Sequence, residues 1–296
     1  MPPSGPEVSV LTAAGTRPIT YKSAREISKM REAGLIVWLA HQRVATMIGP
    51  GVTTAEINRQ IQLTFQEHGA TPLFLNYPPD SPRPFPAETC ISLNEQVVHG
   101  IPNNRRLKSG DIVKVDTGCS IAGWCGDAAV THPIGSIPAN VQHLLEVTRS
   151  ALNEAISALP ECRRWSEVSQ RIEACVRPHR FGIVESLVGH GIGRKLHESP
   201  DVPNYYDPEW KNDFLIRPGL VLAIEPMINV GTKEVQESRD GWTIVSRDRS
   251  YSAHFEHTVA ITEEGPQRLT CEPTESEWNS RSWPDWLPPR ERWLRW

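Results

Sequence analysis

Five side chains in this sequence combine residue types that bind divalent cations. Four are carboxylates and one is an imidazole, and each lies at or near the end of a strand-like segment: Asp116, Asp127, His190, Glu225 and Glu256. Four negative charges are too many for one divalent cation but suit two cations that share bridging carboxylates, and an oxygen-rich set favours Mn²⁺, Fe²⁺, Co²⁺ or Zn²⁺. Two cations roughly 3.5–4 Å apart lower the pKa of a bridging water, which is chemistry suited to hydrolysing an amide or ester.

The imidazole belongs to a glycine-rich segment, Gly189–Pro200, that follows the β-rich run 183–188. We expect a strand opening into a tight turn, because glycine permits positive φ and close backbone approach. Gly189 and Gly191 begin the pattern of a dinucleotide-binding loop, but Arg194 occupies the sixth position and no βαβ unit with a ribose-binding acid follows. A glycine turn with two surface histidines is the alternative, and the carboxylates on other strands favour a cation site over it.

The two aspartates are predicted to lie on the two arms of one hairpin. Residues 111–116 alternate as a strand, a turn is expected near Cys119–Gly123, and the return strand carries Asp127. Like charges that face each other across a ladder destabilise a sheet, so a shared cation is the favoured reason for the pair, with turn-forming aspartates as the alternative. Glu225 and Glu256 each close a further apolar strand, where a lone carboxylate is costly unless it is paired or bound to a metal.

Four amphipathic helices are predicted to cover these strands. Capping boxes begin the first two, which are expected from Ser23 to Met47 and from Thr53 to Gly69. The other two are expected over Asn140–Leu159, capped by Asn140, and over residues 166–176.

Three further segments have distinctive compositions. The proline-dense loop Tyr77–Pro86 is interpreted as a solvent-facing insertion, although a loop of this length can also border a binding pocket. Asp240–Trp242 is predicted to connect a hairpin. Residues 1–20, rich in Pro, Ser, Thr and Gly, are expected to be a flexible lead-in, and residues 271–296, rich in Trp and Pro, a tail that packs back onto its own domain.

Bulk properties narrow the class of protein. The chain has 296 residues and a formal net charge of −4, which argues against a nucleic-acid binder. No apolar run is long enough to span a bilayer, and the first residues lack the pattern of a secretory signal. The six cysteines form no Cys-x-x-Cys pair, so we expect reduced thiols and a cytoplasmic protein.

Several motifs together closely resemble a type I methionine aminopeptidase over about residues 21–270. They are Cys90–Glu95 with His99–Pro102, Asp116, Gly126–Asp127, Gly189–Arg194 with His197–Glu198, Ile224–Met227 and Phe255–Thr258. The short interval from His190 to Glu225 leaves no room for the large insertion of the type II enzymes.

The resemblance implies an α/β (α+β) pita-bread fold, in which two pseudo-symmetric halves with a curved antiparallel sheet, covered by helices, enclose a dinuclear site. It implies that the five residues named at the outset bind two divalent cations (Co, Mn, Fe, Zn or Ni), with Asp127 and Glu256 bridging. Glu225 would also carry a proton, and His197 would contact the scissile amide. Substrate would be bound by His99, with Tyr77, Cys90, Leu196 and Trp242 around the methionine side chain.

The implied function is removal of the initiator methionine from nascent chains whose second residue is small. The expected binding partners are the N-termini of polypeptides, and the protein is expected to bind neither nucleic acid nor membranes. Whether it acts close to the ribosome is left open, and a monomer is the family expectation. One alternative is an Xaa-Pro aminopeptidase or prolidase of the same fold, which usually carries an additional N-terminal domain. A non-catalytic binding protein of this fold is the other, although such proteins typically lose metal ligands.

Overall fold

The computed structural model describes residues 18–296. The flexible lead-in predicted for residues 1–20 therefore lies almost entirely outside the described residues. Within residues 18–296, every helix is too short or too polar to cross a lipid bilayer.

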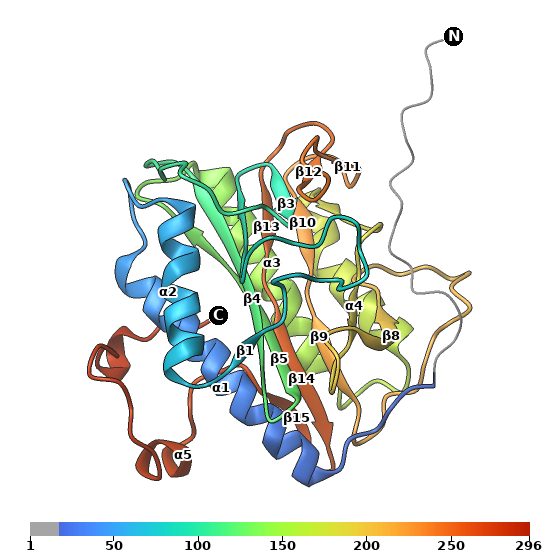
Figure 1. The fold of residues 1–296 in the computed structure, drawn as a ribbon. Helices are drawn as coiled ribbons and strands as arrows, with labels where there is room; N and C mark the ends of the chain where they lie inside the picture. The colour runs from blue at the N-terminus through green and yellow to red at the C-terminus, as the bar shows by residue number, and fades with distance from the viewer. Residues whose placement is uncertain (1–17) are drawn as a thin grey trace.

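The first half of the fold is a helix pair packed on a long antiparallel hairpin (Figure 1). Its elements are α1 (Ala24–Met47), α2 (Thr54–Glu67), β1 (Thr71–Pro72), β2 (Cys90–Leu93), β3 (Gln96–Val98), β4 (Ile112–Ile121) and β5 (Trp124–Pro133). Capping boxes begin both helices as predicted, with Glu26 accepting from the Ser23 amide at 2.8 Å and Glu56 from the Thr53 amide at 2.7 Å. Strand β4 pairs with β1, β2 and β5 in a four-stranded sheet.

The second half places another helix pair over three groups of antiparallel strands. The helices are α3 (Ala139–Ala158) and α4 (Trp165–Val176), followed by the 3₁₀ turn η1 (Arg177–His179). The largest sheet runs in the order β15 (Gly265–Arg268), β14 (His257–Thr262), β9 (Val221–Ile224), β7 (Gly189–Gly191), β8 (Glu198–Val202). A second sheet has the order β13 (Ser252–His254), β10 (Met227–Asn229), β6 (Gly182–Ile183). A third has the order β11 (Val235–Glu237), β12 (Ile244–Ser246), β3.

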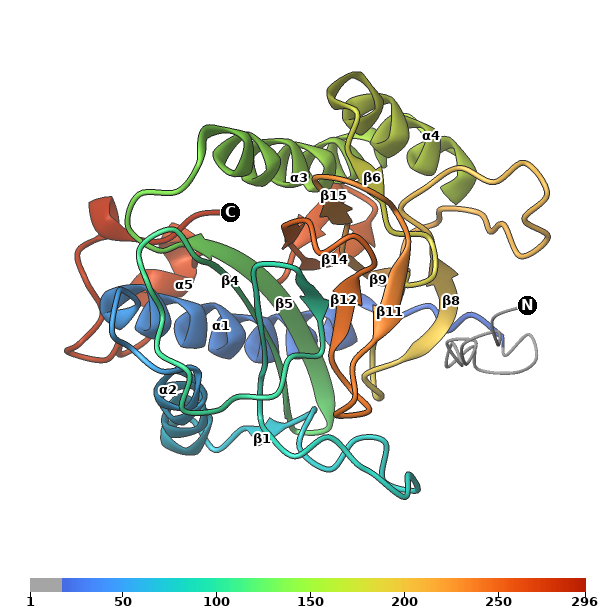
Figure 2. The same ribbon diagram turned by 90° about the horizontal axis from the view of Figure 1, so that it is seen from above.

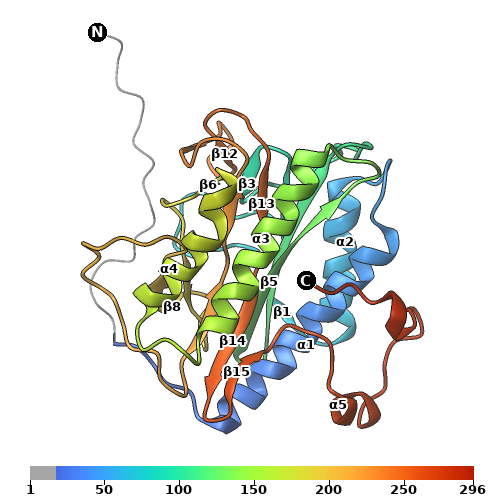
Figure 3. The same ribbon diagram turned by 180° about the vertical axis from the view of Figure 1, so that it is seen from behind.

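Three of the long helices gather on one side of the strands. Seen from behind, α1, α3 and α4 lie in front of the strands (Figure 3). Seen from above, the β4–β5 hairpin of the first half runs beside β14 of the second (Figure 2). Mixed helices and antiparallel strands with a helical cover are what the sequence predicted.

Side-chain hydroxyl groups join the two halves of the strand layer. Thr258 on β14 accepts the Asp127 amide at 3.0 Å and donates to the Asp127 carbonyl at 2.8 Å. Thr131 on β5 makes the same two-way contact with His254, at 2.6 and 2.9 Å. The Glu256 amide adds a backbone bond of 2.9 Å to the carbonyl of Ala129. The contacts align β5 with the start of β14, so the two halves meet at Asp127 and Glu256.

Close packing of α1 on the hairpin requires glycine at the contact. A Cβ atom added to Gly126 would lie 2.8 Å from the amide nitrogen of Gly34 and 3.0 Å from the carbonyl carbon of Ala33. Both are backbone atoms of α1, which cannot rotate away. Glycine at position 126 therefore sets the distance between α1 and the strand that carries Asp127.

Some predicted boundaries are wrong. The cap of α3 is Pro138, two residues before the predicted cap, and Asn140 lies inside the first turn because the helix already begins at Ala139. The strand expected over residues 183–188 ends at Ile183, and His190 lies on the next strand, β7, instead of in a turn. The turn expected near Cys119–Gly123 is confined to Ala122 and Gly123, both with positive φ, because β4 continues through Ile121.

The tail, residues 271–296, packs back onto the domain as predicted. It contains the short helix α5 (Glu275–Asn279) and the 3₁₀ turn η2 (Arg290–Arg292), and it loops along α1 (Figure 3). Trp293 and Trp296 are 8% and 7% exposed. The Trp293 ring contacts Trp38 of α1 edge to face, with the ring centres 5.0 Å apart.

Candidate metal centre

Three of the five candidate ligands meet where the two halves of the chain join. Asp127 comes from β5, His190 from β7, and Glu256 from the residues directly before β14. Each offers one ligand atom, and the three atoms lie within 4.8 Å of one another. Asp127 and Glu256 are 3% and 2% exposed, so both carboxylates are removed from solvent.

Asp116 lies on the same face of the hairpin as Asp127. The β4–β5 register pairs Asp116 with Ala129 and Gly118 with Asp127, so the two aspartates are offset by two residues. The prediction that they face each other across the hairpin is therefore wrong. The offset separates the two like charges while keeping both side chains on one face. Asp116 nonetheless belongs to the same electrostatic group, since burial first and then the charges of Asp127 and Glu225 raise the pKa of its carboxyl.

Glu225 borders the group from the end of β9. Its Oε1 lies 3.6 Å from His190 Nε2, and its Oε2 lies 3.3 Å from His254 Nε2. The other ring nitrogen of His190, Nδ1, lies 3.0 Å from the Gly191 carbonyl oxygen. A carbonyl oxygen only accepts, so Nδ1 carries the proton and Nε2 presents its lone pair towards the carboxylates.

The carboxylates are crowded in a low-dielectric environment. Burial raises the pKa of Asp127 to about 7. Burial and the charges of neighbouring carboxylates also raise the pKa values of Glu225 and Glu256 well above their usual range. Within residues 18–296, one buried oxygen on each of Asp116, Asp127 and Glu256 has no hydrogen-bond partner. Unpartnered buried anionic oxygens are costly, and divalent cations satisfy both their charge and their coordination. The residues present therefore fit a metal centre.

Three more histidines surround this group. The His197 ring packs edge to face against His190, with the ring centres 4.3 Å apart. His99 has a positive φ of 59° and faces Trp242, and burial lowers its pKa to about 4. His254, which sequence reasoning did not single out, is 1% exposed beside Glu225, and burial lowers its pKa to about 3. Its position two residues before Glu256, in a segment that reads as one strand from the sequence, was the available signal, because alternate residues of a strand share a face.

The side chains expected around the substrate gather in one apolar cluster. It contains Tyr77, Cys90, Leu196 and Trp242, together with Phe74, Phe85 and Trp124. Cys90 pairs in register with Asp116, which places the cluster directly beside the carboxylates. The predicted substrate residues and the predicted ligands are thus adjacent.

The proline-dense loop is exposed to solvent at Pro79, Asp80, Pro82 and Arg83, as predicted, and its ends border this cluster, as a loop of this length can. Phe85 is 2% exposed and contacts Trp242 edge to face, with the ring centres 5.2 Å apart. The Tyr77 hydroxyl lies 2.5 Å from His197 Nδ1. The ends of the loop fold inward because Tyr77 and Phe85 pack against the cluster there, while the prolines determine only that the loop forms neither a helix nor a central strand.

The family model of metallopeptidase family M24 matches residues 28–263. Methionine aminopeptidase 1 of Bacillus subtilis is 41% identical over 252 residues, covering 85% of this chain and 99% of that protein. Methionine aminopeptidase 1 of Mycobacterium tuberculosis is 38% identical over 263 residues, covering 86% of this chain and 96% of its own length.

Solved structures give the same result. The methionine aminopeptidase of Thermotoga maritima has a TM-score of 0.80 and 39% identity, and the match covers 86% of this chain and all of that one. The prolidase of Pyrococcus furiosus has a TM-score of 0.65 and 20% identity, and only 66% of its chain is covered, so this likeness supports the shared pita-bread fold alone. The chain therefore belongs to metallopeptidase family M24, and within that family to the methionine aminopeptidases.

Proposed function

We propose that this methionine aminopeptidase removes the N-terminal methionine of peptides and nascent proteins with two divalent cations held by Asp116, Asp127, His190, Glu225 and Glu256. The observation that carries the proposal is the convergence of Asp127, His190 and Glu256 within 4.8 Å. The unpartnered buried oxygens of Asp116, Asp127 and Glu256 support a cation pair at this point. Asp127 and Glu256, at the junction of the two halves, would help to hold both cations.

The chemistry that the cations supply when bound is a water of lowered pKa and an electrophile for the scissile carbonyl. Glu225 takes the proton from the attacking water and passes it to the leaving amine as the carbon–nitrogen bond breaks. Its place between His190 and His254 holds the carboxylate in position for this transfer.

Histidines and the apolar cluster position the substrate. His197 contacts the scissile amide and stabilises the developing charge, and the Tyr77 hydroxyl orients its ring. His99 binds the peptide, and the methionine side chain lies against Tyr77, Cys90, Leu196 and Trp242. A bulky second residue would collide with the wall beyond the scissile bond, so we expect cleavage only before small residues.

The setting of the activity forms part of the same proposal. All six cysteines are free thiols, which suits the reducing cytoplasm where nascent chains are made. We expect a monomer that acts near the ribosome, and sedimentation of the purified protein with and without ribosomes tests both points.

The test is metal reconstitution followed by peptide cleavage. The protein is stripped with a chelator, Mn²⁺, Fe²⁺, Co²⁺, Zn²⁺ or Ni²⁺ is added back separately, and Met-Ala-Ser, Met-Leu-Ser and Ala-Pro-Ala are assayed side by side. We expect metal-dependent release of methionine from Met-Ala-Ser alone. Cleavage of Ala-Pro-Ala instead, or silence with every metal, contradicts the proposal.

Two variants connect that activity to the site. Glu256→Gln removes a proposed bridging charge and should abolish turnover while the protein stays folded. Glu263→Gln makes the same chemical change at an exposed position after β14 and should leave activity unchanged. Retained turnover in Glu256→Gln rules out Glu256 as an essential ligand.

A further inference from the structure

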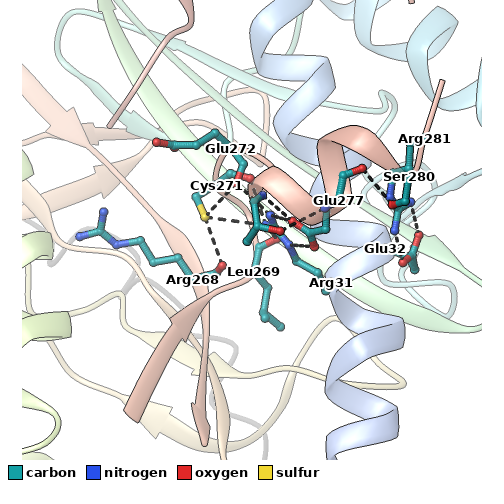
Figure 4. Close-up of polar contacts among 10 residues, drawn as sticks. Arg31, Glu32, Arg268, Leu269, Cys271, Glu272, Glu277, Ser280 and Arg281 are labelled. Carbon is teal, nitrogen blue, oxygen red and sulfur yellow. Dashed lines mark hydrogen bonds and ion pairs between the residues drawn. The ribbon is translucent and has the colours of Figure 1, made fainter. Parts of the chain in front are cut away.

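The tail is fastened to α1 by a group of charged contacts (Figure 4). Arg31 donates from Nε and Nη2 to the two carboxylate oxygens of Glu277, at 2.9 and 2.8 Å. Its guanidinium also donates to the carbonyl oxygens of Leu269, Cys271 and Glu272. One buried arginine thus binds both the beginning of the tail and α5.

The tail continues along α1 to its last residues. Arg281 forms a two-pronged ion pair with Glu32 (Figure 4). Gln42 exchanges two hydrogen bonds with the backbone of Leu294, at 2.9 and 2.8 Å. These contacts fix the path of the tail and bring Trp296 to the backbone of Glu256.

Trp296 contacts the backbone of the candidate ligand Glu256. Its indole Nε1 donates to the Glu256 carbonyl oxygen at 3.1 Å. The Glu256 carbonyl precedes the β14–β9 register, which begins at His257. The indole of Trp296 thus donates a hydrogen bond to a carbonyl that lies outside the β14–β9 ladder.

The neighbouring residue is held in the same way. The ring of His257 stacks on the indole of Trp296 with an interplanar angle of 16°, and its Nε2 lies 3.1 Å from the Trp296 carbonyl oxygen. The opposite ring nitrogen lies 2.9 Å from the hydroxyl of Thr270, which accepts the amide of Thr258. Trp296 and Thr270 therefore fix the backbone from Glu256 to Thr258.

We propose that the tail is an internal strap that positions Glu256 for cation binding, with Trp296 as the positioning residue. The inference rests on the proposed function, because it requires that Glu256 bind a cation. A metal-binding side chain whose backbone is already fixed loses less conformational entropy when it coordinates a cation. Hydrogen bonds to residues that bind a metal are known to change metal affinity.

Trp296→Phe tests the proposal, because phenylalanine keeps a ring against His257 and loses the donor to Glu256. Trp293→Phe is the matched control, since the Trp293 indole donates within the tail, to the Pro288 carbonyl at 2.8 Å. Metal-free full-length proteins are titrated with Co²⁺ or Mn²⁺ by calorimetry, and the visible spectrum of the Co²⁺ form is recorded.

We expect Trp296→Phe to raise the dissociation constant by about three- to tenfold, the effect of one lost hydrogen bond, and to shift the Co²⁺ spectrum. Trp293→Phe should leave both unchanged. The proposal is overturned if Trp296→Phe binds within twofold of the original chain, or if both variants weaken binding equally, since the tail would then act only through general stability.

Failure of the strap is distinguishable from failure of the proposed function. If the unaltered chain binds no cation, the metal centre itself is refuted. If the unaltered chain binds cations and cleaves Met-Ala-Ser while Trp296→Phe behaves identically, only the role of the tail is refuted.

Discussion

Replacing Asp127 by asparagine should stabilise the metal-free protein while preventing metal binding. In the metal-free state, burial raises the pKa of Asp127 to about 7. One pKa unit corresponds to about 1.4 kcal/mol, so the ionised side chain destabilises the folded state by up to about 4 kcal/mol above neutral pH. Neighbouring carboxylates share protons with Asp127 and reduce this figure, so we expect a gain of about 2–4 kcal/mol for Asp127→Asn at pH 8.

The sign of the pH dependence follows from the raised pKa. The folded state binds the proton of Asp127 more tightly than the unfolded state, so the cost is absent below the ordinary aspartate pKa of about 4. It grows as the pH rises towards 7 and is complete above it. The advantage of Asp127→Asn should therefore vanish near pH 4.

Thermal unfolding with and without metal measures both effects. A change of 1 kcal/mol shifts the melting temperature by on the order of 2 °C in a chain of this size. The original chain should gain about 2.7 kcal/mol at a metal concentration one hundred times its dissociation constant, and Asp127→Asn should gain far less. Asp80→Asn, at an exposed position in the proline-dense loop, is the control and should change neither state. A metal-free Asp127→Asn that melts below the original chain at pH 8 would refute the electrostatic account.

Three further perturbations test other parts of the structure. Gly126→Ala should destabilise the fold by about 2 kcal/mol or more in urea unfolding, because its Cβ would meet the backbone of α1. Gly49→Ala is the control and should not destabilise the fold, because the space around its Cβ is open. Equal effects of the two substitutions would contradict the packing argument. Tyr77→Phe should lower kcat/KM by about three- to tenfold, because the contact with His197 is lost, and should leave metal affinity unchanged. A loss of metal affinity instead would contradict the role of Tyr77 in orienting His197. Burial opposes ionisation of Glu277, but hydrogen bonds from Arg31 and from Thr274 outweigh it and lower the pKa to about 2. The stabilising effect of ionised Glu277 should be complete above about pH 4.5 and lost as the pH falls towards 2, and it should amount to about 1 kcal/mol after allowance for solvent screening. In urea unfolding, the stability of Glu277→Gln should therefore fall less steeply with acid than that of the original chain. An equally steep fall would contradict this role.

Local signals predicted the helices well and the strands less well. The capping boxes at Ser23 and Thr53 identify the helix starts because both partners of each box lie within four residues. The β4–β5 hairpin extends into its predicted turn because tertiary packing against α1 holds Gly118 in a strand that the intrinsic preference of glycine does not favour. The register that offsets Asp116 from Asp127 depends on that turn and could not be obtained without it.

The candidate site was predictable as a set of residue types, while its supporting contacts were not. Buried-looking strands that end in carboxylates indicate cation ligands wherever they meet, so the five residues could be grouped before the structure was known. The contact between Trp296 and Glu256 joins positions forty residues apart through an indole and a backbone carbonyl, and neither group leaves a pattern in the sequence. The inward position of Phe85 could not be predicted from the proline-dense loop for the same reason, because its partner, Trp242, is distant in the sequence.

The hydroxyl contacts of Thr131 and Thr258 have a consequence for the chain during its synthesis. They align residues of the first half with residues made much later, and the cluster of Asp127, His190 and Glu256 draws on both. A growing chain that ends before Glu256 lacks this carboxylate and also Thr258, whose hydroxyl holds the Asp127 backbone. Hydrolytic capacity should thus appear in a single step, late in translation, so that unfinished copies of this peptidase are inert.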